Sequence, residues 1–138
     1  MFDKKNYDFS CYVVKYDTVS INRKRYQKDS LAINNGKVVP LLWNHNHFDP
    51  TSVLGWALLE NRDDGLYTYC KLIDSENAKI AKEFIRDKGF VSVSPYVANV
   101  AYLGNYIVCG SIKEVSLVYD RVDRDEAYYP ELRKEVTK

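Results

Sequence analysis

Residues 53–73 read VLGWALLENRDDGLYTYCKLI, and this stretch decides the fold class. Two runs rich in apolar and aromatic residues, 53–60 and 66–73, are separated by Asn61-Arg62-Asp63-Asp64-Gly65. An Asp-Gly pair between two such runs is a strong β-hairpin signal, because these residues adopt the backbone angles that a tight turn needs. We therefore predict two strands joined by this turn.

More strands are expected on both sides of the hairpin. The β-rich runs that predict them lie at residues 11–16, 38–43, 90–100 and 106–119. The last run is expected to form one long strand, or two strands split at Gly110. Pro95 suits an edge strand or a bulge, because proline has no N–H to donate to a neighbouring strand.

Two helices are predicted before residue 90, and residues 126–138 are expected to form a short helix kinked at Pro130 or a frayed linker. Apolar residues recur at helical spacing between an N-cap at Asp74 or Ser75 and a C-terminal signal at Gly89. A shorter helix is expected from Asp29 or Ser30 to Asn35-Gly36. No alternating βαβ units are present. We therefore expect an α+β fold that is mainly β: a mostly antiparallel, barrel-like or sandwich-like sheet with helices packed outside.

Length and composition predict one ordinary globular domain over residues 1–138, and residues 120–138 form a highly charged tail. Lys and Arg number 20 against 19 Asp and Glu, so the net charge of +1 gives no electrostatic case for binding nucleic acid or an anionic membrane. The chain carries 12 tyrosines, which favours β structure.

The three cysteines, Cys11, Cys70 and Cys109, are an odd number and share no close spacing. They are interpreted as free, mostly buried thiols of a reducing compartment rather than as a disulfide framework or a zinc site. The first residues form no apolar signal segment, and no apolar run is long enough to span a bilayer. The expected location is therefore the cytoplasm in which the chain is made.

His45 and His47 are the two histidines, and both follow the predicted strand that ends at Trp43. Histidine is the natural general base near neutral pH. The H-x-H spacing can also form a metal pair, for which Asp49 is the nearest further ligand. Ordinary histidines without a catalytic role are the third interpretation.

Two serines and one carboxylate complete the candidate chemistry. Ser92 and Ser94 stand two residues apart on a predicted strand and therefore face the same way. On another strand, Glu114 and Ser116 share the face opposite Val115. A serine nucleophile needs a base within hydrogen-bond reach, and a carboxylate can orient that base. No nucleophile elbow, phosphate-binding loop or dinucleotide motif occurs, so no cofactor is expected.

At these places together, the sequence resembles the prohead (head maturation) serine protease family of tailed phages. The resemblance covers about residues 36–119 and rests on three stretches. They are PLLWNHNH at 40–47 with SVLGWALLENRDDGLY at 52–67, the serine-bearing strand through Asn99 after the helix that ends at Gly89, and IKEVSLV at 112–118.

This resemblance implies a fold related to the herpesvirus assembly proteases, with a β-barrel ringed by helices. It implies an endopeptidase that cleaves itself, the scaffold and capsid-protein extensions inside the assembling procapsid in the host cytoplasm. By its motifs, His45 is the base, Glu114 the acidic residue that orients it and Ser94 the nucleophile, with Ser92 as the alternative. Homodimerisation or higher assembly is an expectation by analogy, and no metal or cofactor is implied.

Pro95 departs from the family pattern, because proline lacks the backbone N–H that would be available to an oxyanion hole next to the serine. This motivates a second hypothesis, in which the chain is an inactive protease-like scaffold or capsid-binding module. A metal-dependent hydrolase built on His45, His47 and Asp49 is a third.

Overall fold

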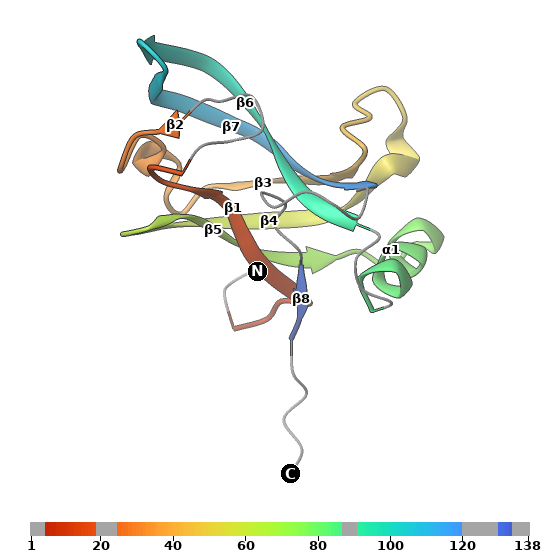
Figure 1. Ribbon diagram of the computed structural model, residues 1–138. Helices are drawn as coiled ribbons and strands as arrows, with labels where there is room; N and C mark the ends of the chain where they lie inside the picture. The colour runs from red at the N-terminus through yellow and green to blue at the C-terminus, as the bar shows by residue number, and fades with distance from the viewer. Residues whose placement is uncertain (1–4, 19–24, 87–90, 120–129, 134–138) are drawn as a thin grey trace.

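The computed structural model describes residues 5–18, 25–86, 91–119 and 130–133. These residues form an eight-stranded sheet, one α-helix and two short 3₁₀ helices (Figure 1). The strands are β1 (Phe9–Lys15), β2 (Arg25–Tyr26), β3 (Val38–Trp43), β4 (Val53–Arg62), β5 (Gly65–Leu72), β6 (Val91–Leu103), β7 (Tyr106–Tyr119) and β8 (Glu131–Leu132). The helices are η1 (Ala32–Asn34), η2 (Pro50–Ser52) and α1 (Glu76–Arg86).

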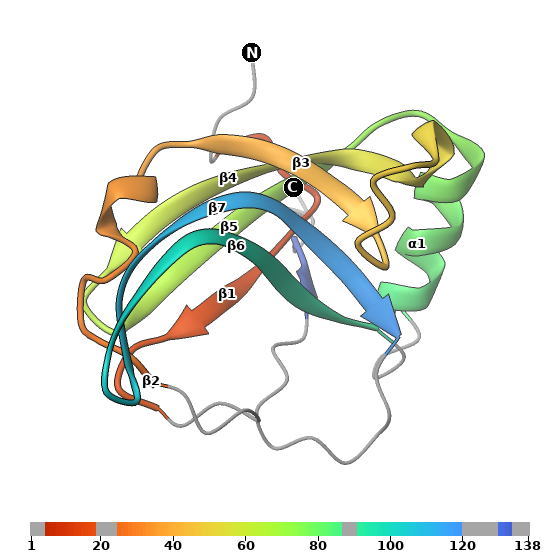
Figure 2. The same ribbon diagram turned by 90° about the horizontal axis from the view of Figure 1, so that it is seen from above.

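The sheet curls into a half-barrel, as Figure 2 shows from above. Its strand order is β2-β7-β3-β4-β5-β1-β8, and β6 pairs with β7. The β2–β7 and β3–β7 pairs are parallel, and the other pairs are antiparallel. Within the described residues no strand pairing joins β6 to β1 or β8. The predicted mainly β, mostly antiparallel sheet is therefore confirmed, whereas the expected ring of helices is reduced in this part of the chain to α1 at one end of the half-barrel.

The β4–β5 hairpin forms as predicted, but its turn is one residue earlier than the Asp-Gly pair. Arg62 pairs with Gly65, so Asp63 and Asp64 make the turn and Gly65 lies in β5. A Cβ atom at Gly65 would lie 2.2 Å from the carbonyl oxygen of Val14 in β1. Glycine is therefore needed at this position for the close approach of β1, rather than for the turn itself.

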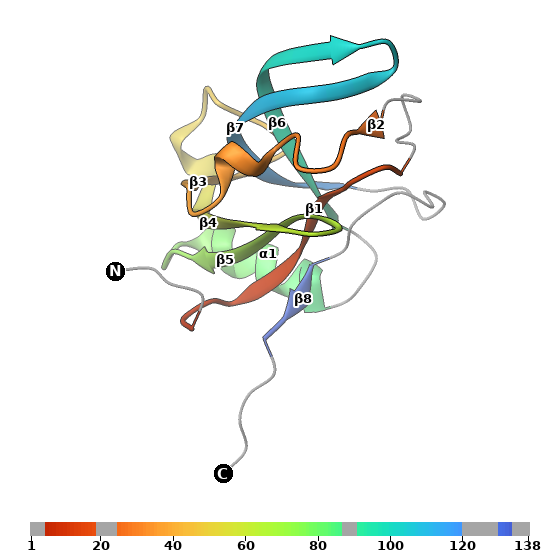
Figure 3. The ribbon, with the colours of Figure 1, turned by 90° about the vertical axis from the view of Figure 1, so that its left-hand side faces the viewer.

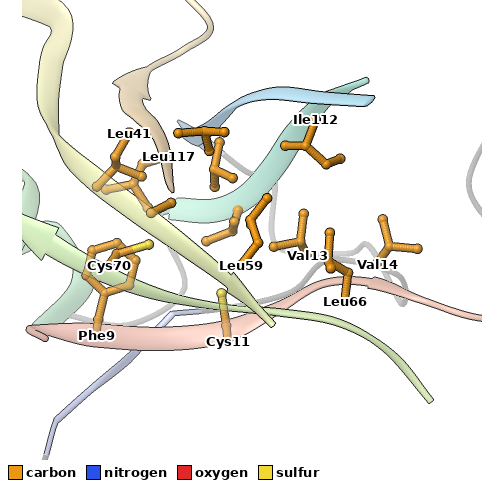
Figure 4. Packing of buried hydrophobic residues seen from close by; sticks show 14 of the residues in the cluster. Phe9, Cys11, Val13, Val14, Leu41, Leu59, Leu66, Cys70, Ile112 and Leu117 are labelled. Carbon is orange, nitrogen blue, oxygen red and sulfur yellow. The ribbon is translucent and has the colours of Figure 1, made fainter. Parts of the chain in front are cut away.

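Apolar side chains from the concave face of the sheet form one hydrophobic core (Figure 4). Its fully buried members include Phe9 and Val13 from β1, Leu59 from β4, and Ile112 and Leu117 from β7. The core thus draws on β1, which lies before the 36–119 stretch that carries the resemblance. Burying large apolar side chains of this kind contributes roughly 1.5–3 kcal/mol each.

Helix α1 packs against the end of the half-barrel at which β3 terminates (Figures 1 and 2). Ser75 caps it as predicted, because the Ser75 Oγ accepts a hydrogen bond of 3.1 Å from the backbone N–H of Ala78. Ala78, Ala81 and Ile85 form its buried face. The predicted C-terminal residue Gly89 lies outside the described residues.

The structure decides between the two expectations for residues 106–119, because β7 is one continuous strand through Gly110. One expectation needs correction: the short helix after Asp29 is a single 3₁₀ turn, whose N-cap Leu31 makes no side-chain capping bond. Pro95, in contrast, lies as predicted in a strand that pairs on one side within the described residues, and the register shifts directly after Tyr96.

None of the three cysteines forms a disulfide; Cys11 and Cys70 are buried and Cys109 is exposed. Of the C-terminal tail, residues 130–133 are described, and Glu131 and Leu132 pair with β1 as β8 (Figure 3). Among the described segments, no helix combines the length and apolar character needed to cross a membrane.

Candidate active site

The parallel pairing of β3 with β7 places His45. Leu42 pairs with Ser116 and Trp43 with Leu117, and the N–H of Asn44 still donates to the carbonyl of Leu117 over 2.9 Å. Asn44 and His45 then adopt φ angles of 53° and 56°. Two successive left-handed residues turn the chain away from the sheet, and this conformation is uncommon for residues other than glycine. The His45 side chain is thereby held beside β7.

The loop after His45 is fixed by its own hydrogen bonds. The hydroxyl of Ser52 donates to the carbonyl oxygens of Asn46 and Asp49. The Asp49 carboxylate accepts from the N–H of Thr51 over 2.9 Å and from its hydroxyl over 2.7 Å. Asn77 of α1 donates to the carbonyl of Thr51 over 2.7 Å, so the helix anchors this loop. The conformation of the loop that carries the histidines is therefore held by hydrogen bonds within the loop and to helix α1.

The imidazole of His45 lies between a carboxylate and a hydroxyl. Its Nδ1 is hydrogen-bonded to Glu114 Oε1, and its Nε2 lies 3.2 Å from Ser94 Oγ. The antiparallel register of β6 and β7 explains this meeting, because Ser94 pairs with Ser116 and Tyr96 with Glu114. The structure thus brings together His45, Ser94 and Glu114, the three residues singled out from the sequence.

Glu114 is buried, with a side-chain exposure of 2%, and its second oxygen is also satisfied. Ser116 Oγ donates to Glu114 Oε2 over 2.6 Å and accepts from the backbone N–H of His45 over 3.0 Å. Ser116 therefore links the carboxylate to the backbone of the histidine. A buried carboxylate is costly unless its oxygens are hydrogen-bonded, and this arrangement supplies those bonds.

This geometry determines what the imidazole can do. In the neutral imidazole with its proton on Nδ1, that N–H donates to Glu114 and Nε2 keeps a lone pair. That lone pair faces the Ser94 hydroxyl. The imidazole is thus oriented to remove a proton from serine, and the carboxylate is placed to stabilise the positive charge that follows.

The structure also places the two other candidate residues, Ser92 and His47. Ser92 is buried at 6% exposure and pairs with Val118, whereas Ser94 is half-buried and faces His45. His47 Nε2 lies 3.7 Å from Glu114 Oε1, and its ring packs edge-on against Tyr96. His47 is thus a neighbour of the same carboxylate.

The proposed metal set of His45, His47 and Asp49 is not assembled. The hydrogen bonds from Thr51 lower the pKa of Asp49, and they engage its carboxylate as the cap of η2. Within residues 5–18, 25–86, 91–119 and 130–133, no group of three or more His, Cys, Asp or Glu side chains is arranged to hold a metal ion. The donor set offered by this loop therefore does not fit a metal centre.

Sequence reasoning did not assign a role in the serine site to two of its neighbours, Ser116 and His47. Ser116 stands two residues after Glu114 on a strand, and this spacing already places it on the same face. That spacing is the signal that points to Ser116. His47 gives no comparable signal, because its approach to Glu114 depends on the path of the loop.

Comparisons of the chain with models of protein families, with curated proteins and with solved structures found no significant match to any of them.

Proposed function

We propose that this chain is a serine endopeptidase of the prohead protease type. The observation that carries the proposal is the position of the His45 imidazole between Ser94 and the buried Glu114. A hydroxyl, an imidazole and a carboxylate in this order are the working parts of a serine protease, and such sites are recognised by geometry rather than by fold.

In the proposed reaction, Ser94 Oγ attacks the carbonyl carbon of the peptide bond while His45 Nε2 accepts the hydroxyl proton. The tetrahedral intermediate collapses to an acyl-enzyme, and His45 returns the proton to the leaving amine. Water then attacks the acyl group by the same proton route and releases the acid. Glu114 keeps the imidazole in the required tautomer throughout.

The location of Ser94 on β6 supports a peptide as the substrate. Within the described residues β6 pairs with β7 alone, so its other side is an edge. An extended peptide can add to such an edge through main-chain hydrogen bonds. This would place a scissile bond beside Ser94 without a deep active-site cleft.

The biological setting is proposed from the resemblance at residues 36–119. The substrates would be the phage scaffold, the capsid-protein extensions and the protease itself, enclosed in the procapsid in the host cytoplasm. Enclosure raises the effective concentration of protease and substrate. A fold relationship to the herpesvirus assembly proteases, and homodimerisation or higher assembly, belong to the same proposal.

The test is co-expression of the chain with the capsid and scaffold proteins encoded beside it, as wild type and as Ser94→Ala. We expect trimmed products with the wild type and none with Ser94→Ala, because loss of the nucleophile typically costs several orders of magnitude in rate. Mass spectrometry of the capsid proteins gives the readout. Equal trimming by both chains would overturn the assignment of Ser94.

Ser92→Ala is the matched control, because Ser92 lies two residues earlier on the same strand and pairs with Val118 away from Glu114. We expect it to trim as the wild type does. Covalent labelling with a serine-directed phosphonate gives an independent readout, with Ser94 as the expected modified residue.

Pro95 favours a second candidate, an inactive protease-like scaffold or capsid-binding module. It follows Ser94 directly and has no N–H to stabilise an oxyanion. This candidate predicts that neither the wild type nor Ser94→Ala trims the capsid proteins, and that the phosphonate labels neither chain. Co-purification with the scaffold or capsid protein would then be the activity to measure.

A further inference from the structure

A pocket of about 550 Å³ lies beside the proposed nucleophile. Its lining comes from two segments: His45, His47 and Phe48 from the loop after β3, and Pro95 and Tyr96 from β6. The volume falls in the range of roughly 300–1,000 Å³ that is typical of ligand pockets. It is large enough for one large side chain and the adjoining main chain.

The walls of this pocket are unusually apolar for an exposed surface. The Phe48 residue is 96% exposed and the Tyr96 residue 48% exposed. At this exposure, the Phe48 side chain contributes almost nothing to the hydrophobic core. Large aromatic side chains that stay in solvent beside a catalytic site typically gain their burial from a partner.

The pocket presents no fixed charge to a ligand. Its lining contains neither lysine, arginine, aspartate nor glutamate. The nearby Glu114 is buried, and its two oxygens are taken up by His45 and Ser116. A charged side chain packed against this lining would therefore give up part of its hydration without finding a lysine, arginine, aspartate or glutamate partner there, which is unfavourable.

We propose that this pocket binds a large apolar side chain of the peptide substrate, preferably an aromatic one, at a residue next to the cleaved bond. The proposal deepens the proposed protease function and rests on it. Pro95 and Tyr96 directly follow Ser94, and His45 both lines the pocket and contacts Ser94. A side chain held here therefore belongs to a residue adjoining the scissile peptide.

Phe48 and Tyr96 determine this specificity in different ways. The Tyr96 ring packs edge-on against the His47 ring, at a centroid distance of 5.5 Å. This contact fixes the wall of the pocket that Tyr96 forms. The backbone N–H of Phe48 donates to Asn46 Oδ1 over 3.1 Å, and this bond fixes the backbone of the loop. The Phe48 ring itself remains in solvent. An incoming aromatic ring can pack against both of these rings.

The first test is digestion of a mixed peptide pool by the full wild-type chain, with cleavage sites identified by mass spectrometry. We expect Phe, Tyr, Leu and Met to be enriched on one side of the cleaved bond and charged residues to be depleted there. Phenylalanine should be preferred over alanine roughly tenfold or more at that position. Cleavage with no such enrichment, or with a preference for a charged residue, would overturn the pocket proposal.

The second test compares Phe48→Ala and Tyr96→Ala with Ile33→Ala, which removes another exposed apolar side chain, 76% exposed and located in η1. The quantity measured is the ratio of kcat/KM for a phenylalanine peptide to that for its alanine analogue. Taking this ratio within one variant cancels differences in the folded, active fraction. We expect a several-fold fall in the ratio for the two pocket variants and no change for Ile33→Ala. An unchanged ratio in both pocket variants would contradict the proposal.

A binding measurement separates failure of the pocket from failure of the protease function. N-acetyl-phenylalaninamide and N-acetyl-lysinamide are titrated into the full chain and followed by two-dimensional NMR. We expect saturable shifts at Phe48 and Tyr96 with the first compound only. Such shifts in a chain that cleaves nothing would support the pocket and contradict the protease; equal or absent shifts with both compounds would contradict the pocket.

Discussion

At the scale of single residues, Ser116 connects the parts of the site. Its side chain is fully buried, and its hydroxyl joins Glu114 Oε2 to the backbone N–H of His45. The two bonds fix the carboxylate against the residue whose ring it orients. Ser116 touches no reacting atom, so its role is that of a positioning residue.

Ser116→Ala is expected to lower kcat by about 10- to 100-fold with little change in KM, because small misplacements of catalytic groups cost on that order. Steady-state kinetics on one peptide substrate measures this split. Ser111→Ala is the matched control: Ser111 is also on β7, and its hydroxyl accepts from Lys37 Nζ over 3.1 Å. A loss confined to stability, with kcat equal to that of the control, would contradict the positioning role.

The cysteines differ in accessibility, and this gives a second residue-scale prediction. Burial raises the pKa of Cys70 to about 12, and Cys11 is also buried, whereas Cys109 is exposed. A thiol reacts as its thiolate, so a buried thiol with a raised pKa is inert. We expect iodoacetamide at pH 8 to modify Cys109 alone in the folded chain and all three thiols after unfolding. Peptide mapping that finds Cys70 modified under native conditions would contradict this arrangement.

Some residue-level features of the site could be predicted from the sequence. Ser94 and Glu114 follow from strand alternation and from the family resemblance. The left-handed φ of His45 could not be predicted, because histidine has no strong preference for it and the conformation depends on the bond from Asn44 to β7. The contact of His47 with Glu114 depends on the same turn.

At the scale of elements, the β4–β5 hairpin depends on a close approach of two backbones. A Cβ atom at Gly55 in β4 would lie 1.8 Å from the carbonyl oxygen of Lys71 in β5. Contacts that short do not occur, and both atoms belong to paired strands. Gly55 is therefore required by the pairing.

Gly55→Ala is expected to destabilise the protein by about 3 kcal/mol or more, because the strands must separate to admit the methyl group. Gly104→Ala is the control. Gly104 has a φ of 61° with open space around it, so its substitution incurs only the backbone penalty of about 1 kcal/mol. Urea unfolding followed by circular dichroism measures both changes. Equal losses for the two variants would show that the β4–β5 contact is not the cause.

The elements themselves were largely predictable, but their pairing was not. The strand at 38–43 and the long strand at 106–119 have the predicted bounds, since apolar runs and turn residues mark both. The parallel pairing of β3 with β7 leaves no local signal, because its partners are far apart in the chain. This pairing is nevertheless what places His45 beside Glu114.

At the scale of the whole molecule, stability is expected to fall as the pH rises above about 9. Burial raises the pKa of Cys70 from 9.0 to about 12 and that of Tyr16 from 10.0 to about 12. Between these values the unfolded chain releases protons that the folded chain retains, so a higher pH favours unfolding. The stabilising contribution is complete below about pH 9 and is lost as the pH approaches 12.

Urea unfolding at several pH values between 9 and 11 measures this dependence. Each such group contributes a slope of up to about 1.4 kcal/mol per pH unit. In Cys70→Ala the slope should be shallower, whatever the change in stability at neutral pH, because one titrating group is gone. Parallel curves for the wild type and Cys70→Ala would show that Cys70 does not titrate in this range.

The pairing of β3 with β7 also determines the stage of synthesis at which the site can form. His45 meets Ser94 across 49 positions of the chain and Glu114 across 69. Contacts between residues so distant along the chain require the closure of long loops, so they are intrinsically slow to form. A nascent chain on the ribosome has no oriented imidazole until β7 has emerged and joined the sheet. Synthesis thereby delays the proposed cleavage until the sheet is complete.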